Sequence, residues 1–148
     1  MPAAFTLDAS FFLNVFDPLE AGHPASRDLL NRLQAISASI VVPTLVLPEV
    51  AGAASRARGD AIAGQRYATE LVRLPNIEFV SLDTGLAHQA AYIAATHRLR
   101  GADAVYAAVA QRFAAVLVTR DRQQRERLAP VVTIRSPEEA LAEDLGSS

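Results

Sequence analysis

The sequence alternates short apolar or β-branched runs with longer segments of helical periodicity, from near its start to its end. Five runs are predicted to be strands: residues 4–7, 39–42, 77–82, 115–118 and 131–134. Runs this short and this apolar are typical of strands buried on both faces. Because one or two helical segments follow each of them, neighbouring strands are expected to run parallel. The sequence therefore predicts an α/β fold, with a parallel central sheet and helices on both of its faces.

Capping residues mark where several of the predicted helices begin. Thr44 is expected to cap the helix that contains Glu49, and Asp83 or Thr84 the helix that ends near residue 99. The segment 102–113 is almost wholly apolar, which predicts a buried helix. Ser136 precedes a proline and two acids, the pattern of a capped helix start.

Length and hydropathy predict a single domain over residues 1–148, with a core of about 4–142 and a loose tail at 143–148. The longest uncharged run, residues 33–48, contains two prolines and is too short to span a bilayer. Residues 1–4 lack the basic start of a signal peptide. We therefore expect a cytoplasmic protein that is not associated with a membrane.

Two missing residue types exclude several chemistries. All 14 basic residues are arginine, so there is no P-loop lysine, Schiff-base lysine or phosphoreceiver lysine. The absence of cysteine excludes disulfides, thiolate zinc sites, iron–sulfur clusters and thiol nucleophiles. The net charge of −2 argues weakly against nucleic-acid binding.

Four acids fall near predicted strand ends. Asp8 directly follows the first strand, and Asp121 follows the fourth. Asp103 stands in the first turn of the apolar helix, and Glu49 lies in the helix after the second strand. Ligand sites in parallel sheets lie beyond the carboxyl ends of the strands, so we expect these four side chains at one edge.

Each acid, taken alone, has a simpler explanation. Asp8 and Asp121 could be turn or cap residues, which is the commoner role of an aspartate after a strand. Asp103 could merely complement a helix dipole, and Glu49 could pair with an arginine. As a set, however, four converging carboxylates would repel one another unless a cation lay between them. Oxygen ligands alone select Mg²⁺ or Mn²⁺, and the chemistry that fits is phosphodiester hydrolysis.

The motifs around these acids also resemble those of a known family. They are Leu7-Asp8-Ala9-Ser10, Pro48-Glu49-Val50, Gly101-Ala102-Asp103-Ala104-Val105-Tyr106 and Val118-Thr119-Arg120-Asp121. In this order, and over residues 5 to about 141, the chain resembles PIN domains, most of all the VapC-type toxins of toxin–antitoxin modules.

The resemblance implies a PIN-like α/β/α fold and a Mg²⁺- or Mn²⁺-dependent endoribonuclease. It places Asp8, Glu49, Asp103 and Asp121 at the metal site. It also implies a homodimer, an RNA substrate and a cognate antitoxin that inhibits the enzyme.

Supporting roles follow for residues beside these acids. The hydroxyl residues Ser10 and Thr119 would support the first and last acids. Arg100 and Arg120 are the arginines predicted to contact RNA phosphates, whereas solvated helix faces are the better explanation for most of the others. Tyr106 is expected to pack in the core or an interface.

The chain departs from the family pattern at two places. Arg122, Gln123 and Gln124 follow Asp121, where many members carry an aromatic or apolar residue that packs the turn. Pro48, directly before Glu49, could alter how the glutamate points.

Two alternative functions are open to a chain with these residues. One is a non-catalytic PIN-like module that binds RNA or protein; the other is a phosphohydrolase or phosphoreceiver of the same fold class. The missing lysine, and Ser10 in place of a second acid, argue against the phosphohydrolase. Removing the four proposed ligands leaves 12 acids against 14 arginines. The net charge therefore does not oppose RNA binding.

Overall fold

The computed structural model describes residues 4–143 and 145. Along the chain it has β1 (Phe5–Leu7), α1 (Ala9–Phe16), α2 (His23–Ala35), β2 (Ile40–Pro43), α3 (Val46–Arg58), α4 (Ala61–Arg73), β3 (Ile77–Val80), α5 (Thr84–His97), α6 (Gly101–Arg112), β4 (Val116–Val118), α7 (Arg122–Leu128), β5 (Ile134–Arg135) and α8 (Pro137–Ala142). The five strands form one sheet in the order β3-β2-β1-β4-β5, and every pairing is parallel. The predicted α/β fold with a parallel sheet is confirmed.

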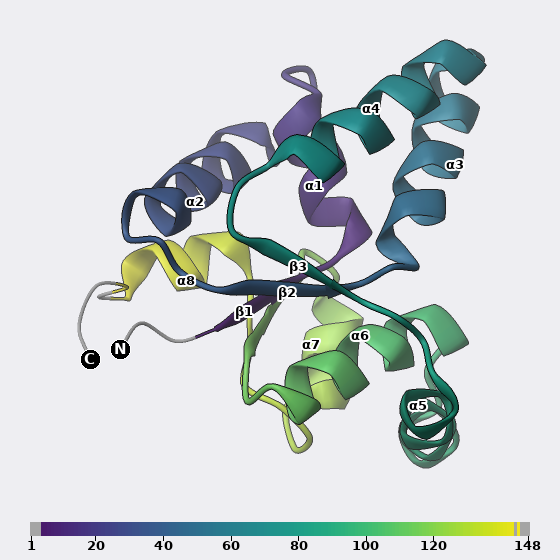
Figure 1. Ribbon diagram of the computed structural model, residues 1–148. Coiled ribbons are helices and arrows are strands. Elements are labelled where there is room, and N and C mark those ends of the chain that lie inside the picture. Colours follow the sequence, from purple (N-terminus) through teal and green to yellow (C-terminus); the bar gives the residue numbers. More distant parts are fainter. Residues whose placement is uncertain (1–3, 144, 146–148) are drawn as a thin grey trace.

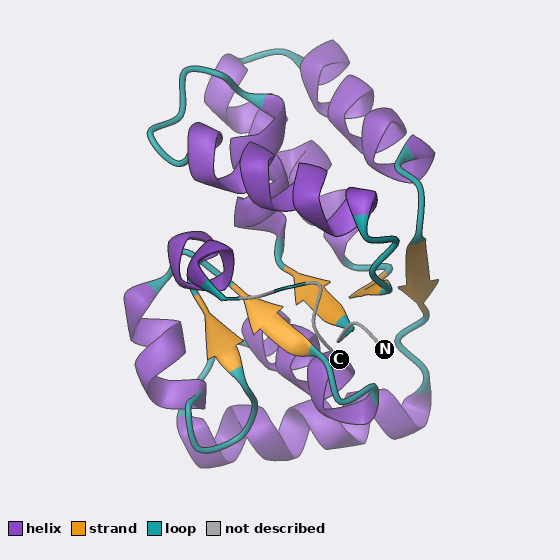
Figure 2. Cartoon of the chain, turned by 90° about the vertical axis from the view of Figure 1, so that its left-hand side faces the viewer, coloured by secondary structure: helices purple, strands orange, loops and turns teal. Residues whose placement is uncertain are grey.

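The helices form a layer on each face of the sheet. Helices α1–α4 lie on one face and α5–α7 on the other, with α8 returning to contact α2 (Figures 1 and 2). This division follows from the handedness of parallel connections. The chain moves from β1 to β2 and β3 in one direction, then crosses back through α5 and α6 to reach β4. Right-handed crossovers in opposite directions place their helices on opposite faces.

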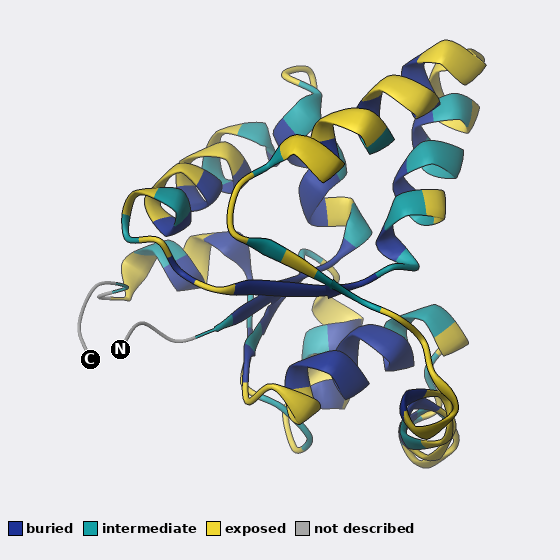
Figure 3. Ribbon diagram, in the orientation of Figure 1, coloured by how far each residue is buried: buried dark blue, intermediate teal, exposed yellow. Residues whose placement is uncertain are grey.

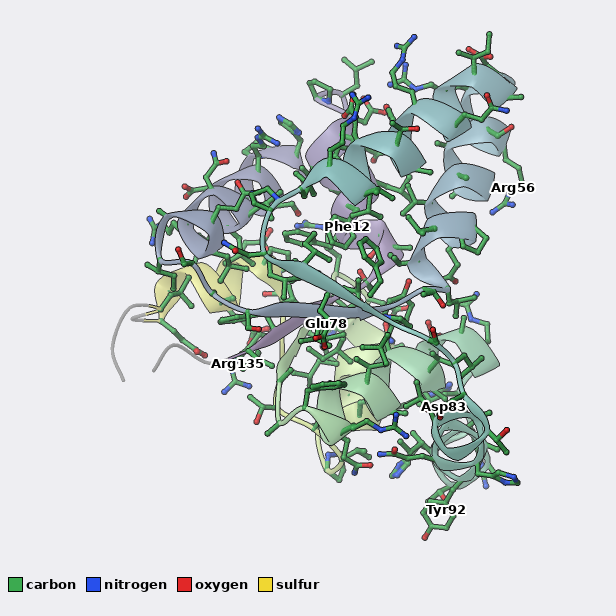
Figure 4. The ribbon with its side chains drawn as sticks, in the orientation of Figure 1. Phe12, Arg56, Glu78, Asp83, Tyr92 and Arg135 are labelled. Atoms are coloured by element: carbon green, nitrogen blue, oxygen red, sulfur yellow. The ribbon has the colours of Figure 1, made fainter. Side chains whose placement is uncertain are left out.

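The core fills the space between the sheet and these two layers (Figure 3). The inner strands β1 and β2 are wholly buried, whereas the edge strand β3 is only partly covered. Phe12 of α1 points into this core, and its ring meets that of Phe11 edge to face at 5.5 Å (Figure 4). Such pairs add about 0.5–1.5 kcal/mol beyond the area they bury.

Helix α6 is the most deeply buried helix on its face. Every residue from Ala104 to Ala110 is buried, as the apolar sequence predicts. Its position beneath the sheet carries Asp103, in its first turn, toward the strand ends. Among the described residues, no helix is both long and apolar enough to cross a membrane.

Helices α3 and α4 form a hairpin that extends away from the sheet (Figure 1). Gly59 ends α3 in a left-handed conformation with φ of 62°, and Asp60 caps α4 by accepting from the Ile62 N–H at 2.9 Å. A Cβ atom on Gly64 would collide with the backbone carbonyl of Ala51. The glycine therefore sets how closely the two helices approach.

Two local predictions were wrong. Thr44 is not a cap: α3 begins after Leu45, and the Thr44 N–H instead extends the sheet by donating to Val80 O at 2.9 Å. The last strand is shorter and later than predicted, because Val131 and Val132 fold back to donate to Leu128 O. The final helix does carry the predicted capping box, between Ser136 and Glu139. Most of the predicted tail, residues 144 and 146–148, lies outside the described residues.

Candidate functional site

The sheet offers one place where a ligand crevice is expected, at the carboxyl ends of β1 and β4. The chain leaves β1 toward β2 on one side, whereas β4 and β5 lie on the other side, so the strand order reverses here. Leu7 pairs with Val118, which makes Asp8 and Thr119 the next residues of two neighbouring strands. The Asp8 N–H donates to Val118 O at 3.4 Å.

Asp8 is a buried carboxylate at this position, only 8% exposed. It caps α1 by accepting from the Phe11 N–H at 3.0 Å, and the Ser10 hydroxyl donates to the same oxygen, Oδ1, at 2.7 Å. Burial raises the pKa of Asp8, and the nearby Asp103 raises it further; hydrogen bonds from Thr119, Ser10 and Phe11 oppose the rise. The charged form of Asp8 is therefore costly, and a cation beside it would lower that cost.

Asp121 follows β4 and caps α7. Its Oδ1 accepts from the Gln124 N–H at 3.1 Å, and its own N–H donates to Thr119 Oγ1 at 3.2 Å. Thr119 is fully buried between the two strand ends. Its hydroxyl accepts from the Asp121 N–H and donates to Gln124 Oε1 at 3.0 Å, and Leu7 pairs with Val118 directly before Asp8 and Thr119, which places Thr119 next to Asp8.

Asp103 reaches the same region from α6, and its side chain is 22% exposed. Its Oδ2 lies 3.3 Å from Nε of Arg100, whose side chain is 83% exposed. An ion pair this exposed is weak, so the arginine is not fixed there. Arg100 therefore stands beside a site acid and can turn toward an anionic ligand.

Glu49, on α3, is held by a residue that the sequence did not assign to the site. The Tyr106 hydroxyl donates to Glu49 Oε1 at 2.6 Å. Burial, and next the Glu49 carboxylate, raise the pKa of Tyr106, so the hydroxyl keeps its proton. Tyr106 was expected to be a packing residue, and it is indeed buried. Pro48 sits in the first turn of α3, where its missing N–H costs nothing, and the helix continues through Glu49.

A pocket of about 340 Å³ opens beside Asp103 and Asp121. Carboxylates, amides and guanidinium groups share its lining, which consists of Arg98, Leu99, Arg100, Asp103, Asp121, Gln123, Gln124 and Arg127. Among the described residues, Asp8 and Glu49 do not contribute to this lining. Arginines around two acids are the arrangement expected where a polyanion meets a cation site.

Arg120 lies elsewhere. Its Nη1 is 2.8 Å from Glu138 Oε1, and a Cβ on Gly22 would come within 2.6 Å of its Nε. The structure therefore packs Arg120 against the loop before α2 and ties it to α8, outside the pocket lining. Its predicted contact with RNA stays a prediction.

The donors at this edge suit a hard divalent cation. Carboxylate and hydroxyl oxygens are the ligands of Mg²⁺ and Mn²⁺. In residues 4–143 and 145, no three Asp, Glu or His side chains lie close enough to enclose an ion. Mg²⁺ does not require such a cage, because it commonly binds through one or two carboxylates and keeps several waters. By donor type, and by the cost of the buried charge on Asp8, the residues fit such an ion.

Comparison with known proteins identifies the class. The model of the PIN domain family matches residues 5–128, and the chain belongs to that family. The resemblance noted from the motifs is therefore confirmed. No curated protein matches the sequence significantly.

Solved structures with the same fold include several toxin–antitoxin proteins. Mycobacterium tuberculosis VapC20, described as a sarcin-ricin loop cleaving toxin, is 20% identical with a TM-score of 0.70, covering 88% of this chain and 98% of VapC20. FitAcB from Neisseria gonorrhoeae is 19% identical with a TM-score of 0.69, and the match covers 90% of this chain and 98% of FitAcB. VapBC2 from Rickettsia felis, bound to a promoter DNA fragment, is 14% identical with a TM-score of 0.67, and the match covers 90% of this chain and 98% of the matched chain.

Proposed function

We infer that this protein is a metal-dependent endoribonuclease, the toxin of a type II toxin–antitoxin pair. The observation that carries this inference is the buried Asp8 carboxylate at the reversal of strand order, with Asp103 beside it. A folded protein keeps a costly buried charge mainly where function requires it. Membership of the PIN family and the fold shared with VapC toxins support the same function.

Asp8 and Asp103 would bind the Mg²⁺ or Mn²⁺ ion most directly, and Glu49 and Asp121 would bind it directly or through water. When bound, the ion would supply Lewis-acid activation of the scissile phosphate and of the attacking water. Tyr106 holds Glu49 by one oxygen, Oε1, so the other oxygen can accept a hydrogen bond from water. Ser10 would support the site by donating a hydrogen bond to Asp8, and Thr119 by accepting one from the Asp121 N–H.

Arg100 would contact a backbone phosphate of the RNA. It lines the pocket, stands 3.3 Å from Asp103 and is exposed enough to move. Phosphate contacts of this kind position a substrate without reading its sequence. The RNA target is therefore not specified by this residue.

The partners follow from the same proposal. Structures with this fold include VapBC complexes, in which a toxin is bound to its antitoxin, and a cognate antitoxin is proposed here. A homodimer and a cytoplasmic location are proposed with it.

The test is cleavage of a structured RNA by the purified protein, with Mg²⁺, with Mn²⁺ and with a chelator. We expect cleavage only with a divalent ion, and its loss in Asp103→Asn at unchanged Tm. Cleavage at the wild-type rate by Asp103→Asn, or in the presence of the chelator, would contradict the proposal.

A second candidate is a non-catalytic module that binds RNA or protein. One observation favours it: the described acids do not enclose a ready-made ion cage. Calorimetric titration with Mn²⁺ separates the two functions. Binding that disappears in Asp8→Asn supports the nuclease, whereas no binding supports the module.

A further inference from the structure

Gln124 is a buried polar residue whose side chain the proposed function does not yet use. It is 4% exposed, lies in the first turn of α7 and contributes to the lining of the pocket beside Asp103 and Asp121. Within the described part of the chain, its Nε2 has no hydrogen-bond partner. A buried amide nitrogen without a partner costs about 1–3 kcal/mol, so an apolar side chain would be the more stable choice here.

The other end of this amide meets Thr119. The Thr119 hydroxyl donates to Gln124 Oε1 at 3.0 Å, and the same hydroxyl accepts from the Asp121 N–H. Thr119 also lies next to Asp8, because Leu7 and Val118 pair directly before them, and its hydroxyl acts to lower the pKa of the Asp8 carboxyl group. A threonine hydroxyl has one proton and two acceptor positions, so it cannot donate to Gln124 and Asp8 together.

Rotation of the Gln124 amide by 180° resolves this competition. Nε2 then takes the place of Oε1 and donates to Thr119, and the Thr119 proton turns to Asp8. Every donor and acceptor position of the hydroxyl is used in this arrangement: it accepts from Asp121 and Gln124 and donates to Asp8. The group left unpaired becomes a carbonyl oxygen, which proteins tolerate better than an unpaired buried N–H.

We propose that Gln124 is a positioning residue that acts through Thr119: its amide sets the direction of the Thr119 hydroxyl and thereby holds Asp8 and Asp121 in place for the divalent ion. The backbone of Gln124 strengthens the link, because its N–H also donates to Asp121 Oδ1 at 3.1 Å. This inference rests on the proposed nuclease function and adds a residue to the same site.

The test compares Gln124→Met with Gln89→Met. Methionine keeps the length and volume of glutamine but removes the amide. Gln89 makes an amide hydrogen bond to Gln111 between α5 and α6, outside the pocket lining, and so controls for the same chemical change. Mn²⁺ binding is measured by calorimetry, Tm by thermal unfolding, and RNA cleavage in parallel.

We expect Gln124→Met to bind Mn²⁺ about 10- to 100-fold more weakly, the usual effect of losing a residue that supports metal ligands. Its Tm is expected to be equal to or above that of the wild type. Gln89→Met is expected to bind Mn²⁺ and cleave RNA normally. Unchanged Mn²⁺ affinity in Gln124→Met, or a loss of affinity that follows a loss of Tm, would overturn the inference.

A double-mutant cycle with Thr119→Val tests the route of action. If Gln124 acts through Thr119, Gln124→Met has no further effect on Mn²⁺ affinity once the hydroxyl is gone. Additive effects overturn the inference while leaving the nuclease proposal intact. A wild type that neither binds Mn²⁺ nor cleaves RNA overturns both.

Discussion

Asp8 and Asp83 occupy the same local position in two regions of the molecule. Each follows a parallel strand, and each caps the next helix by accepting a backbone N–H, from Phe11 at 3.0 Å and from Leu86 at 2.8 Å. Asp8 lies inside the sheet at the reversal of strand order, whereas Asp83 follows the edge strand β3 and stands at the start of α5 (Figure 4).

Their surroundings give the two carboxyl groups opposite properties. Burial raises the pKa of Asp8, and Asp103 adds to the rise. The Leu86 N–H lowers the pKa of Asp83, with Arg112 contributing at 3.6 Å. Both acids share the cap hydrogen bond, and burial near a second acid is what distinguishes Asp8 from Asp83.

RNA cleavage is expected to show the largest difference between the two regions. Asp8→Asn should lower the cleavage rate at least about 100-fold, because it removes a proposed ligand of the divalent ion. Asp83→Asn should cleave at the wild-type rate. Rates are compared on the same RNA with Mg²⁺ present, and equal losses in both variants would remove the distinction.

In the absence of divalent ions, the variant that loses cleavage activity is expected to be the more stable one. Asparagine still caps α1, so Asp8→Asn loses only the buried charge and should raise Tm by about 2–4 °C at neutral pH. Asp83→Asn should lower Tm slightly, since a favourable charge near Leu86 and Arg112 is lost. Thermal unfolding in the presence of a chelator measures both. A lower Tm in Asp8→Asn would show that its charge is not costly.

The same two variants should differ in their pH dependence. The pKa of Asp8 is raised, so its charge reduces stability as pH rises from 3.8 through the native pKa. The advantage of Asp8→Asn should therefore shrink on acidification and disappear below about pH 3.8. The pKa of Asp83 is lowered, so its contribution is present above 3.8 and is lost below that value. Tm measured against pH checks the signs, and matching profiles would contradict them.

The smallest expected effect is on RNA binding, and it comes from the arginines that stand beside the two regions, Arg100 near Asp103 and Arg112 near Asp83. Arg100→Ala should raise the KM for RNA about two- to fivefold and reduce the slope of log affinity against log salt by about 0.7. Arg112→Ala removes the partner of Asp83 and should leave both quantities unchanged. Salt titrations of RNA binding measure the slope. An equal slope in all three proteins would exclude Arg100 from phosphate contact.

The sequence predicted the features that are encoded locally. The strands appear as short apolar runs, and an aspartate that follows an inner strand is placed by chain connectivity alone. That is why Asp8 and Asp121 could be brought to one edge, and why Asp83 could be assigned as a cap instead.

Contacts between distant elements could not be predicted in this way. The bond from Tyr106 to Glu49 joins α6 to α3, and the turn of Arg120 toward Glu138 depends on where α8 lies. Gln124 is polar, so the sequence offered no reason to expect it to be buried. It is buried because α7 places it against Thr119. The prediction that Thr44 caps a helix was wrong because its backbone N–H bonds to Val80 O and so continues the pairing of β2 with β3.

The order of the strands also determines when, during synthesis of the chain, the two sides of the site can come together. Asp8 is among the first residues synthesised, but its neighbour in the sheet, Thr119, is added 111 residues later. At about 5–20 residues per second, the two meet no sooner than roughly 5–20 s after Asp8 leaves the peptidyl-transferase centre. A ribosome-bound chain that stops before β4 holds Asp8, Glu49 and Asp103, yet it lacks Asp121 and the strand that lies beside β1.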